Sequence, residues 1–360
     1  MKRIAIKIGS NVLTRSDGTL DLTNLSSLVD QIAELHRKGI EIILISSGAV
    51  ASGRSEISVK GKLDDVSARQ LYSAVGQAKL INHYYDFFRE HKIACGQVLT
   101  TKESLSTRRH YLNQKNCVSV MLENKVIPIL NENDTISVTE LMFTDNDELS
   151  GMIAAMMDAE VLIILSNIDG VYNGSPSDPA SEVIRIIDQK KEVADYIQEN
   201  HSTFGRGGML TKYRIARKVA SEGIEVIIAN GRRKNILPDI IENKKDTIYT
   251  RFVASPKSSS SIKKWIAHSD SFAKGEIHIN ALAAQALLGK QAVSLLPVGI
   301  VQVTGHFEKD DIVKILDEKK QLIGVGKSSF DSEKTTELIG KKGSKPIIHY
   351  DYLYLLPKND

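Results

Sequence analysis

Short apolar runs alternate with longer stretches of helical periodicity through most of this chain. Ile4–Ile8 is typical of a buried strand, and apolar residues recur at helical spacing from Leu22 to Leu35, before Gly39 ends that helix. Glu41–Ile45 then reads as a second buried strand. This alternation predicts an α/β fold, a three-layer αβα sandwich in which helices cover both faces of a mainly parallel sheet.

The alternation continues beyond these segments. Further strands are expected at Ala94–Leu99, Val126–Leu130, Val161–Leu165 and Glu225–Ala229, and further helices at Ser67–His91, Arg109–Lys125, Asp147–Ala159 and Lys212–Glu222. Small and polar residues follow most of the strands directly, and in a parallel sheet ligands bind beyond the carboxyl ends of strands. The sequence therefore predicts one functional edge, built from Gly9-Ser10, Ser46–Ala49, Asn131–Asp134, Ser166-Asn167 and Asn230-Gly231.

The pattern changes near residue 253, and a chain of 360 residues is long for one domain. Ser255–Ser261 has linker composition, although Lys263-Lys264-Trp265 indicates partial order. Beyond Gly275 the expected elements are short strands with one helix, Ala281–Leu288. We therefore expect a first domain at 1–253, a linker at 254–274 and a small β-rich domain at 275–357.

Composition excludes several classes of protein. Basic residues number 47 and acidic residues 44, so the net charge of +3 gives no electrostatic footprint for nucleic acid. Cys95 and Cys117 form no C-x-x-C pattern, and the nine histidines lack metal-ligand spacing. No apolar run approaches the ~18 residues of a membrane span. Because Met1-Lys2-Arg3 leads directly into a strand, no room remains for a signal peptide, and we expect a cytoplasmic protein.

The glycine-rich run Gly205–Lys212 precedes an expected helix. Glycine permits close approach of backbone N–H groups, and a helix start adds free N–H groups and a positive dipole end. The spacing matches neither the Walker A motif nor a G-x-G-x-x-G turn. From its own residues, the run is either a phosphate site or a plain glycine turn.

Lys7 lies inside an otherwise apolar strand, where an ammonium group is costly unless it reaches water or a partner. It belongs either to an edge strand with one exposed face or to a site in which it points toward phosphate oxygens. We favour the second interpretation because Lys212 supplies a second cation. The segment Ser47-Gly48-Ala49 is compatible both with a helix cap and with binding of a substrate carboxylate.

Two polar clusters carry the strongest signal, Asn131-Glu132-Asn133-Asp134 and Asp145-Asn146-Asp147-Glu148. Acids at the start of a helix commonly stabilise its N-terminus, which is the structural explanation for the second cluster. Amides and carboxylates gathered at one sheet edge also suit recognition of an ammonium group and organisation of lysines or Mg²⁺. We favour this functional interpretation.

Together these motifs resemble the amino acid kinase family, and among its members the glutamate 5-kinases. The matching segments occur in family order: Lys7-Ile8-Gly9-Ser10, Ser46-Ser47-Gly48-Ala49, Asn131-Glu132-Asn133-Asp134, Asp145-Asn146-Asp147 and Gly207-Gly208-Met209-Leu210-Thr211-Lys212. The segment from Gly275 is similar to the PUA domain found in many bacterial members. The resemblance covers nearly the whole chain.

The resemblance implies transfer of the ATP γ-phosphoryl group to the side-chain carboxylate of L-glutamate, the first step of proline biosynthesis. It implies catalytic roles for Lys7 and Lys212, with Asp147 holding both lysines. Implied glutamate contacts are Ser47, Gly48, Asn131, Asp134 and Asn146; implied ATP contacts are Lys7, Gly9, Ser10, Ser166, Asn167 and the run Arg206-Gly207-Gly208-Met209-Leu210-Thr211-Lys212. Mg²⁺ is expected on the phosphates with few protein ligands. An ionised carboxylate needs no general base, so in-line transfer requires only alignment and charge neutralisation.

Two positions depart from the family pattern. Ser166-Asn167 replaces the usual Thr-Asp, which removes a carboxylate from the implied nucleotide contacts, and Arg206 replaces a small residue. The resemblance further implies inhibition by proline and a homodimer or homotetramer. The alternatives are a family member acting on N-acetylglutamate, aspartate or a nucleoside monophosphate, and, less favoured, an RNA-binding protein that acts through its PUA-like segment.

Overall fold

The computed structural model describes residues 1–59, 61–136, 146–188, 208–256, 261–269, 273–289 and 293–356. The chain divides into two compact units, residues 1–258 without 106–108, and residues 259–360 with 106–108. The division falls inside the segment 254–274 expected as a linker, and that segment also contains helix α10 (Ser261–Ala267). None of the described helices combines the length and the hydrophobicity that crossing a bilayer requires.

An eight-stranded sheet organises the first unit, in the order β3-β4-β2-β1-β5-β7-β8-β6. Its strands are β1 (Arg3–Ile8), β2 (Glu41–Ser46), β3 (Cys95–Thr100), β4 (Ile127–Glu132), β5 (Val161–Ser166), β6 (Ile186–Ile187), β7 (Glu225–Asn230) and β8 (Tyr249–Phe252). The strands from β3 to β7 in this order pair in parallel, whereas β8 pairs antiparallel with β7 and β6 pairs in parallel with β8. The predicted mainly parallel sheet is confirmed.

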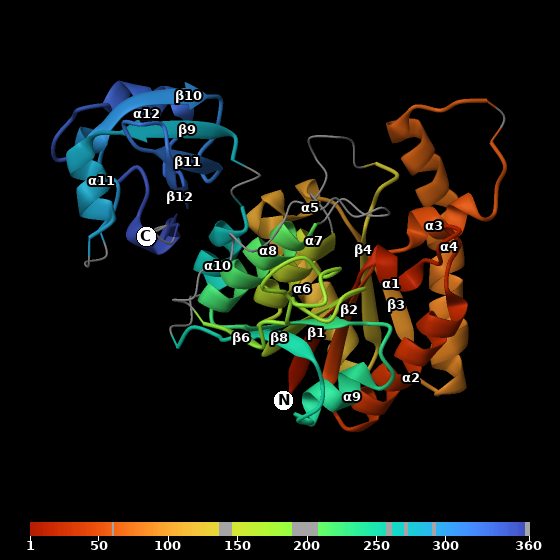
Figure 1. Ribbon diagram of the computed structural model, residues 1–360. Coiled ribbons are helices and arrows are strands. Elements are labelled where there is room, and N and C mark those ends of the chain that lie inside the picture. The colour runs from red at the N-terminus through yellow and green to blue at the C-terminus, as the bar shows by residue number, and fades with distance from the viewer. Residues whose placement is uncertain are drawn as a thin grey trace. The chain divides into compact units, whose positions relative to one another are not determined.

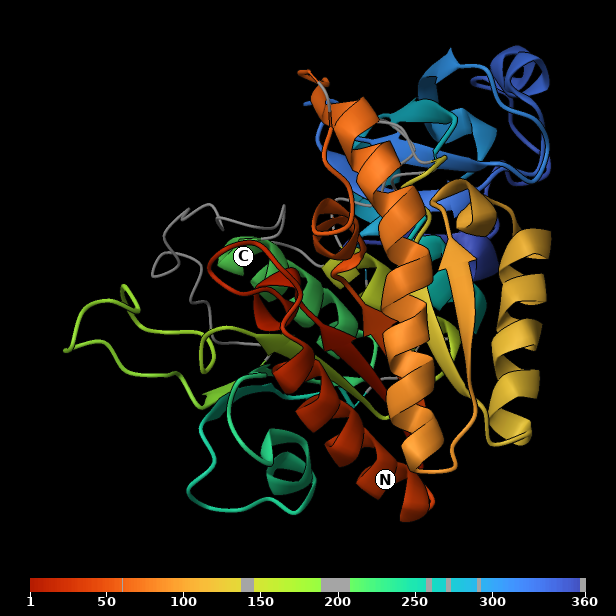
Figure 2. The same ribbon diagram turned by 90° about the vertical axis from the view of Figure 1, so that its right-hand side faces the viewer.

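Helices cover both faces of the sheet (Figure 1). Those of the first unit are α1 (Ser10–Leu13), α2 (Leu22–Arg37), α3 (Ala49–Arg54), α4 (Asp65–Glu90), α5 (Glu103–Ser106), α6 (Arg108–Glu123), α7 (Asn146–Met156), α8 (Met209–Ser221) and α9 (Ile236–Ile241). Figure 2 shows α2 in red and α4 in orange lying over the strands. The three-layer arrangement expected from the sequence is therefore confirmed.

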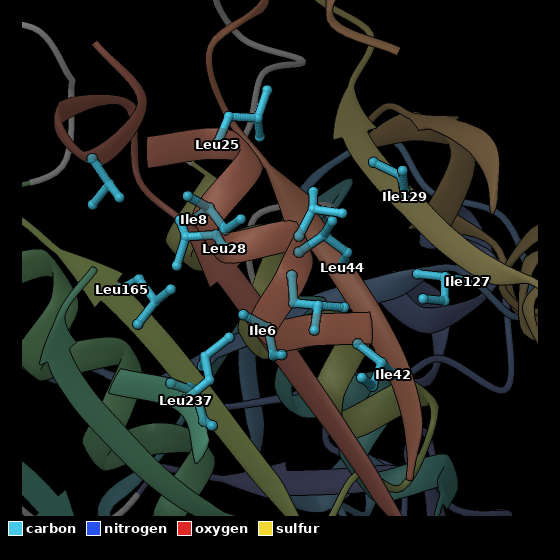
Figure 3. Packing of buried hydrophobic residues seen from close by; sticks show 14 of the residues in the cluster. Ile6, Ile8, Leu25, Leu28, Ile42, Leu44, Ile127, Ile129, Leu165 and Leu237 are labelled. Atoms are coloured by element: carbon cyan, nitrogen blue, oxygen red, sulfur yellow. The ribbon is translucent and has the colours of Figure 1, made fainter. Parts of the chain in front are cut away.

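Side chains alternate between the two faces of a sheet, so alternate residues of β1 face opposite helical layers. Ile4, Ile6 and Ile8 pack with α2, α4 and α9 in one buried apolar cluster, part of which is drawn in Figure 3. Ala5 and Lys7 therefore point to the opposite face, which α7 and α8 cover. β1 lies between β2 and β5, so Lys7 is on a central strand and the edge-strand interpretation is excluded.

Helices α3 and α4 approach so closely that backbone touches backbone at their crossing. A Cβ atom on Gly53 would lie 1.9 Å from the carbonyl oxygen of Tyr72, and one on Gly76 would lie 1.8 Å from that of Ala49. Both values are far below van der Waals contact, so only glycine fits at either position. Since α3 begins directly after Ser47-Gly48, this crossing fixes α4 relative to that strand end.

The second unit contains a five-stranded sheet in the order β10-β9-β11-β12-β13. Its strands are β9 (Gly275–Ile279), β10 (Ile300–Gly305), β11 (Ile312–Leu316), β12 (Leu322–Lys327) and β13 (Leu353–Leu355), and its helices besides α10 are α11 (Ala281–Leu287), α12 (Ser332–Leu338) and the short 3₁₀ turns η4 (Pro297–Gly299) and η5 (Tyr350–Tyr352). Its own buried cluster includes Ile277, Phe307 and Ile348. The small β-rich domain is confirmed, but the expectation of a single helix is wrong, because α12 follows Asp331 as its cap.

The close crossing of α3 and α4 predicts that Gly76→Ala destabilises the protein, although replacing a helical glycine by alanine usually stabilises one. Helix propensity alone would make the alanine more stable by ~1 kcal/mol. The collision with Ala49 must push the helices apart, which costs about 1–3 kcal/mol or more. We expect a net loss of stability in urea unfolding. Ala78→Gly at an exposed position of the same helix measures the propensity term alone, and a stabilised Gly76→Ala would contradict the close crossing.

Candidate functional site

A buried ion triplet lies where β1 ends. The ammonium group of Lys7 is 2.5 Å from one carboxylate oxygen of Asp147, and that of Lys212 is 2.9 Å from the other. Asp147 stands in the first turn of α7, and Lys212 in the first turn of α8. The carboxylate is fully buried and both lysines are nearly so. Asp147 thus aligns two cations that come from distant parts of the sequence.

The charges of the triplet depend on one another. Burial by itself would raise the pKa of Asp147, but the neighbouring ammonium groups of Lys7 and Lys212 outweigh it and lower that pKa to about 2. The triplet carries a net positive charge with Asp147 ionised. Such a charge, held in place before a ligand arrives, suits phosphate oxygens whose negative charge must be neutralised during transfer.

An amide network lies next to the triplet. The side-chain nitrogen of Asn146 donates to Ser47 Oγ at 3.0 Å and to Asn131 Oδ1 at 2.9 Å. Asn131 Oδ1 also accepts from the backbone N–H of Glu132. The Oδ1 atom of Asn146 is buried and has no hydrogen-bond partner among the described residues. Three residues implied by the resemblance as substrate contacts therefore meet, and they leave one acceptor for a donor on a ligand.

Gly48 connects this network to α3 through a left-handed backbone conformation, with φ at +106°. Glycine adopts this conformation without the steric cost of a side chain. The turn follows directly from Ser47, whose backbone N–H donates to Ile8 O at 3.1 Å. The ends of β1 and β2 are therefore tied together beside the ion triplet.

Glu132, the last residue of β4, and Asp134, two residues further on, form an acidic group, and both are buried. Arg69 of α4 contacts both carboxylates, and Ser73 Oγ donates to Asp134 Oδ2 at 3.2 Å. The sequence interpretation included Asp134 but missed Arg69 and Ser73. Their spacing on one helix face gave a signal, but only the fold shows which loop that face meets.

The implied nucleotide side is less completely described. Ser166 is buried at the end of β5, Asn167 is exposed, and their side chains approach at 3.5 Å. Gly208 precedes α8 as its N-terminal cap residue, and Met209, Leu210 and Thr211 form the first turn of that helix, where they are half-buried. Arg206 and Gly207 of the same run lie outside the described residues, as does Asp145.

Gly9 and Ser10 begin the short helix α1 immediately after β1. The backbone N–H of Gly9 donates to Leu165 O at 3.1 Å, and a Cβ on Gly9 would approach that oxygen to 3.0 Å and Lys7 Nζ to 3.4 Å. Glycine at this position therefore keeps the space beside the ammonium group open. Gly9 and Ser10 join Lys7 at the same strand end, as the sequence predicts.

A carboxylate that the sequence interpretation missed is present near the implied nucleotide contacts. Asp169 accepts two hydrogen bonds of 2.6 Å from Arg233 and one of 3.0 Å from Asn230. The hydrogen bonds from Arg233 are the main cause of the lowered pKa of Asp169. Asp169 stands two residues after Asn167, so it supplies a carboxylate at this edge of the sheet.

Known proteins resemble this chain over nearly its whole length. Residues 2–230 match the model of the amino acid kinase family, and residues 275–350 match the PUA domain. A protein of Bacteroides thetaiotaomicron named glutamate 5-kinase is 68% identical over 353 residues, which cover 98% of each chain. One of the same name from Chlorobaculum tepidum is 46% identical and covers 99% of this chain and 98% of the relative.

Solved structures extend the likeness at low identity. Carbamate kinase from Giardia lamblia bound to AMP-PNP is 16% identical, with a TM-score of 0.50, over 71% of this chain and 99% of that one. At such identity the likeness concerns the fold alone. It is consistent with the three-layer architecture of the first unit.

The lowered pKa of Asp147 predicts a specific acid dependence of stability. A carboxyl group with an ordinary pKa of 3.8 and a folded value of about 2 stabilises the protein above its ordinary pKa and ceases to do so as pH falls through the folded value. The unfolding free energy of the native chain should fall on the order of 2 kcal/mol more than that of Asp147→Asn between about pH 5 and pH 2. Urea unfolding at several pH values measures the difference. Parallel pH curves for the two proteins would contradict the pairing.

Proposed function

Because the chain belongs to the amino acid kinase family, and within it to the glutamate 5-kinases, we propose that it transfers the γ-phosphoryl group of ATP to the side-chain carboxylate of L-glutamate. The product is L-glutamyl 5-phosphate, and the reaction is the first step of proline biosynthesis. The observation that carries the proposal is the buried triplet of Lys7, Asp147 and Lys212 at the sheet edge, next to the amide network of Ser47, Asn131 and Asn146.

In this mechanism the two lysines bind the phosphate oxygens of ATP. Phosphoryl transfer passes through a transition state with negative charge spread over the moving group, so cations fixed before the reaction lower its barrier. Asp147 orients Lys7 and Lys212 and does not itself react. The backbone N–H groups of the run ending in Lys212 complete the phosphate site.

The acceptor is the side-chain carboxylate of glutamate, which is ionised at neutral pH because its ordinary pKa is about 4.3. It attacks the γ-phosphorus directly, and ADP leaves with the bridging oxygen. No proton is removed, so the site needs no general base. Catalysis then consists of alignment and charge neutralisation.

Glutamate is held through its amino acid head group. Ser47 and the backbone at Gly48 receive the α-carboxylate, Asp134 pairs with the α-ammonium group, and Asn131 and Asn146 complete the pocket. The buried, unpaired Asn146 Oδ1 supports this arrangement because it offers an acceptor inside the network. These contacts place the side-chain carboxylate toward Lys7.

Mg²⁺ accompanies ATP and neutralises part of the phosphate charge. Among the described residues, no group of three or more His, Cys, Asp or Glu side chains is arranged to hold a metal ion. The buried carboxylate of Asp147 is already held between two ammonium groups. On nucleotides Mg²⁺ usually keeps several waters and is held through phosphate oxygens, so we propose few protein ligands for it.

Three finer points belong to the same proposal. The cytoplasm is the proposed location, since the reaction consumes ATP and both cysteines are free thiols.

A homodimer or homotetramer is the proposed assembly, and gel filtration with light scattering measures it. We favour no RNA-binding role for the second unit, because basic and acidic residues are nearly balanced in number.

A coupled ADP-release assay tests the reaction directly. The protein should turn over L-glutamate and not N-acetylglutamate, aspartate or UMP. Lys7→Met and Lys212→Met should each lower kcat at least ~10²-fold, because a fixed charge contact in the transition state is lost. Lys115→Met, which removes an ammonium group paired with Asp158 at the surface, is the matched control and should keep full activity. Turnover with another acceptor and none with glutamate would refute the assignment.

Proline should inhibit by competing with glutamate, because both ligands carry an α-carboxylate and a cationic nitrogen. Millimolar proline at low glutamate should raise the apparent KM for glutamate and leave kcat unchanged. Initial rates over a grid of both concentrations measure the effect. Rates that do not respond to proline would remove this part of the proposal.

A further inference from the structure

Arg69 connects helix α4 to the acidic segment Glu132–Asp134 at the end of β4. One of its terminal nitrogens contacts Asp134 Oδ1, and the same nitrogen lies 3.6 Å from Glu132 Oε2. The side chain of Arg69 is only 23% exposed, and those of Glu132 and Asp134 are 3% and 8% exposed. A single guanidinium group therefore lies between two buried carboxylates.

We propose that Arg69 is a positioning residue that determines specificity for a free α-amino acid, because it holds Asp134 in the orientation that receives the substrate's ammonium group. The inference rests on the proposed function, in which Asp134 binds that ammonium group. It adds a residue outside the implied substrate contacts, on a helix that supplies none of them.

The contacts of Asp134 define its orientation. One carboxylate oxygen meets Arg69 and the other accepts from Ser73 Oγ at 3.2 Å. Arg69 and Ser73 are four residues apart on α4, so they lie on the same helix face. One turn further, Gln77 Nε2 donates to the backbone oxygen of Glu132 at 3.2 Å. Three side chains of one helix face thus fix the segment that carries Asp134.

Charge explains why a cation is needed at this position. Two neighbouring buried carboxylates repel each other and lose hydration, and a planar guanidinium group can satisfy both at once. Arg69 brings one positive charge to the two carboxylates, and the proposed function assigns the ammonium group of the substrate to Asp134.

The ion triplet has the opposite balance. Lys7 and Lys212 exceed Asp147 by one positive charge. Asn146, which begins α7 next to Asp147, joins the two regions because its side-chain nitrogen donates to Asn131 Oδ1. Negative charge thus faces the amino group and positive charge faces the phosphates. A substrate whose amino group is acylated brings no cation to balance the acidic group, so the site discriminates against it.

Replacing Arg69 distinguishes two roles: Arg69 either orients Asp134 for the substrate or competes with the substrate's ammonium group for that carboxylate. If Arg69 merely occupied Asp134 in place of the substrate's ammonium group, Arg69→Gln would free that carboxylate and tighten glutamate binding. If Arg69 positions Asp134, the same change releases a buried carboxylate beside Glu132 and weakens binding. The KM for glutamate therefore reports which role holds.

The test uses steady-state kinetics of the full chain and of Arg69→Gln, Arg69→Lys and Arg89→Gln. Arg69→Gln should raise the KM for glutamate about tenfold or more and change kcat and the KM for ATP less than about threefold, because a charge-assisted contact at the head group is lost. Arg69→Lys should restore part of the affinity, because it keeps the charge but loses the fork of donors. Arg89→Gln, at an exposed position of the same helix, should match the unaltered protein.

Two further measurements separate positioning from a general structural effect. The inhibition constant of glutarate, which lacks the amino group, should be unchanged in Arg69→Gln. In an Asp134→Asn background, Arg69→Gln should add little to the KM increase, since both changes then act on one contact. The proposal would be overturned if Arg69→Gln weakened the binding of glutarate and glutamate equally, or if the KM increases of the two changes were additive in the double variant.

The outcomes also separate this inference from the proposed function. If the unaltered protein turns over glutamate and Arg69→Gln has an unchanged or lower KM, only the role of Arg69 is overturned. If the unaltered protein does not turn over glutamate, both proposals are overturned.

Discussion

The carboxylate of Asp147 is the point on which the site depends, because it pairs with two lysines that come from distant parts of the sequence. Lys7 is part of the central strand β1, Lys212 begins α8, and Asp147 begins α7. An ammonium group in the interior of a sheet is costly unless a buried anion compensates it. The same pairing that makes Lys7 tolerable inside the fold also directs its charge to the sheet edge. Stability and the proposed catalytic geometry therefore share one ion triplet.

Much of the first unit follows from periodicity alone. The strands near Ile4, Glu41 and Val161 and the helix from Leu22 lie within a few residues of their predicted limits, because long apolar patterns determine them. The short helix α9 and the strands β6 and β8 were not predicted, because they are too brief to show a period and depend on contacts with distant strands. In the second unit α12 was missed for the same reason.

The candidate site shows the same division. Lys7, Ser47, Asn131, Asn146 and Asp147 gather at one edge because parallel strands end there, which is a consequence of topology that the alternation of elements already contains. Arg69 and Asp169 were missed. Arg69 lies near the start of the long helix α4, and only tertiary packing decides which loop that part of the helix meets. Asp169 lies beyond the expected strand end, and its partner Arg233 comes from the turn between β7 and α9.

The glycine crossing of α3 and α4 has a consequence for motion. With backbone against backbone at Gly53 and Gly76, the two helices cannot slide or tilt independently and behave as one rigid body. One end of this body starts at Ser47-Gly48, and its other helix carries Arg69 and Ser73 against Asp134. A displacement of this body that moves Ser47 therefore moves the side chains that contact Asp134 as well. The two halves of the proposed head-group pocket are therefore mechanically coupled.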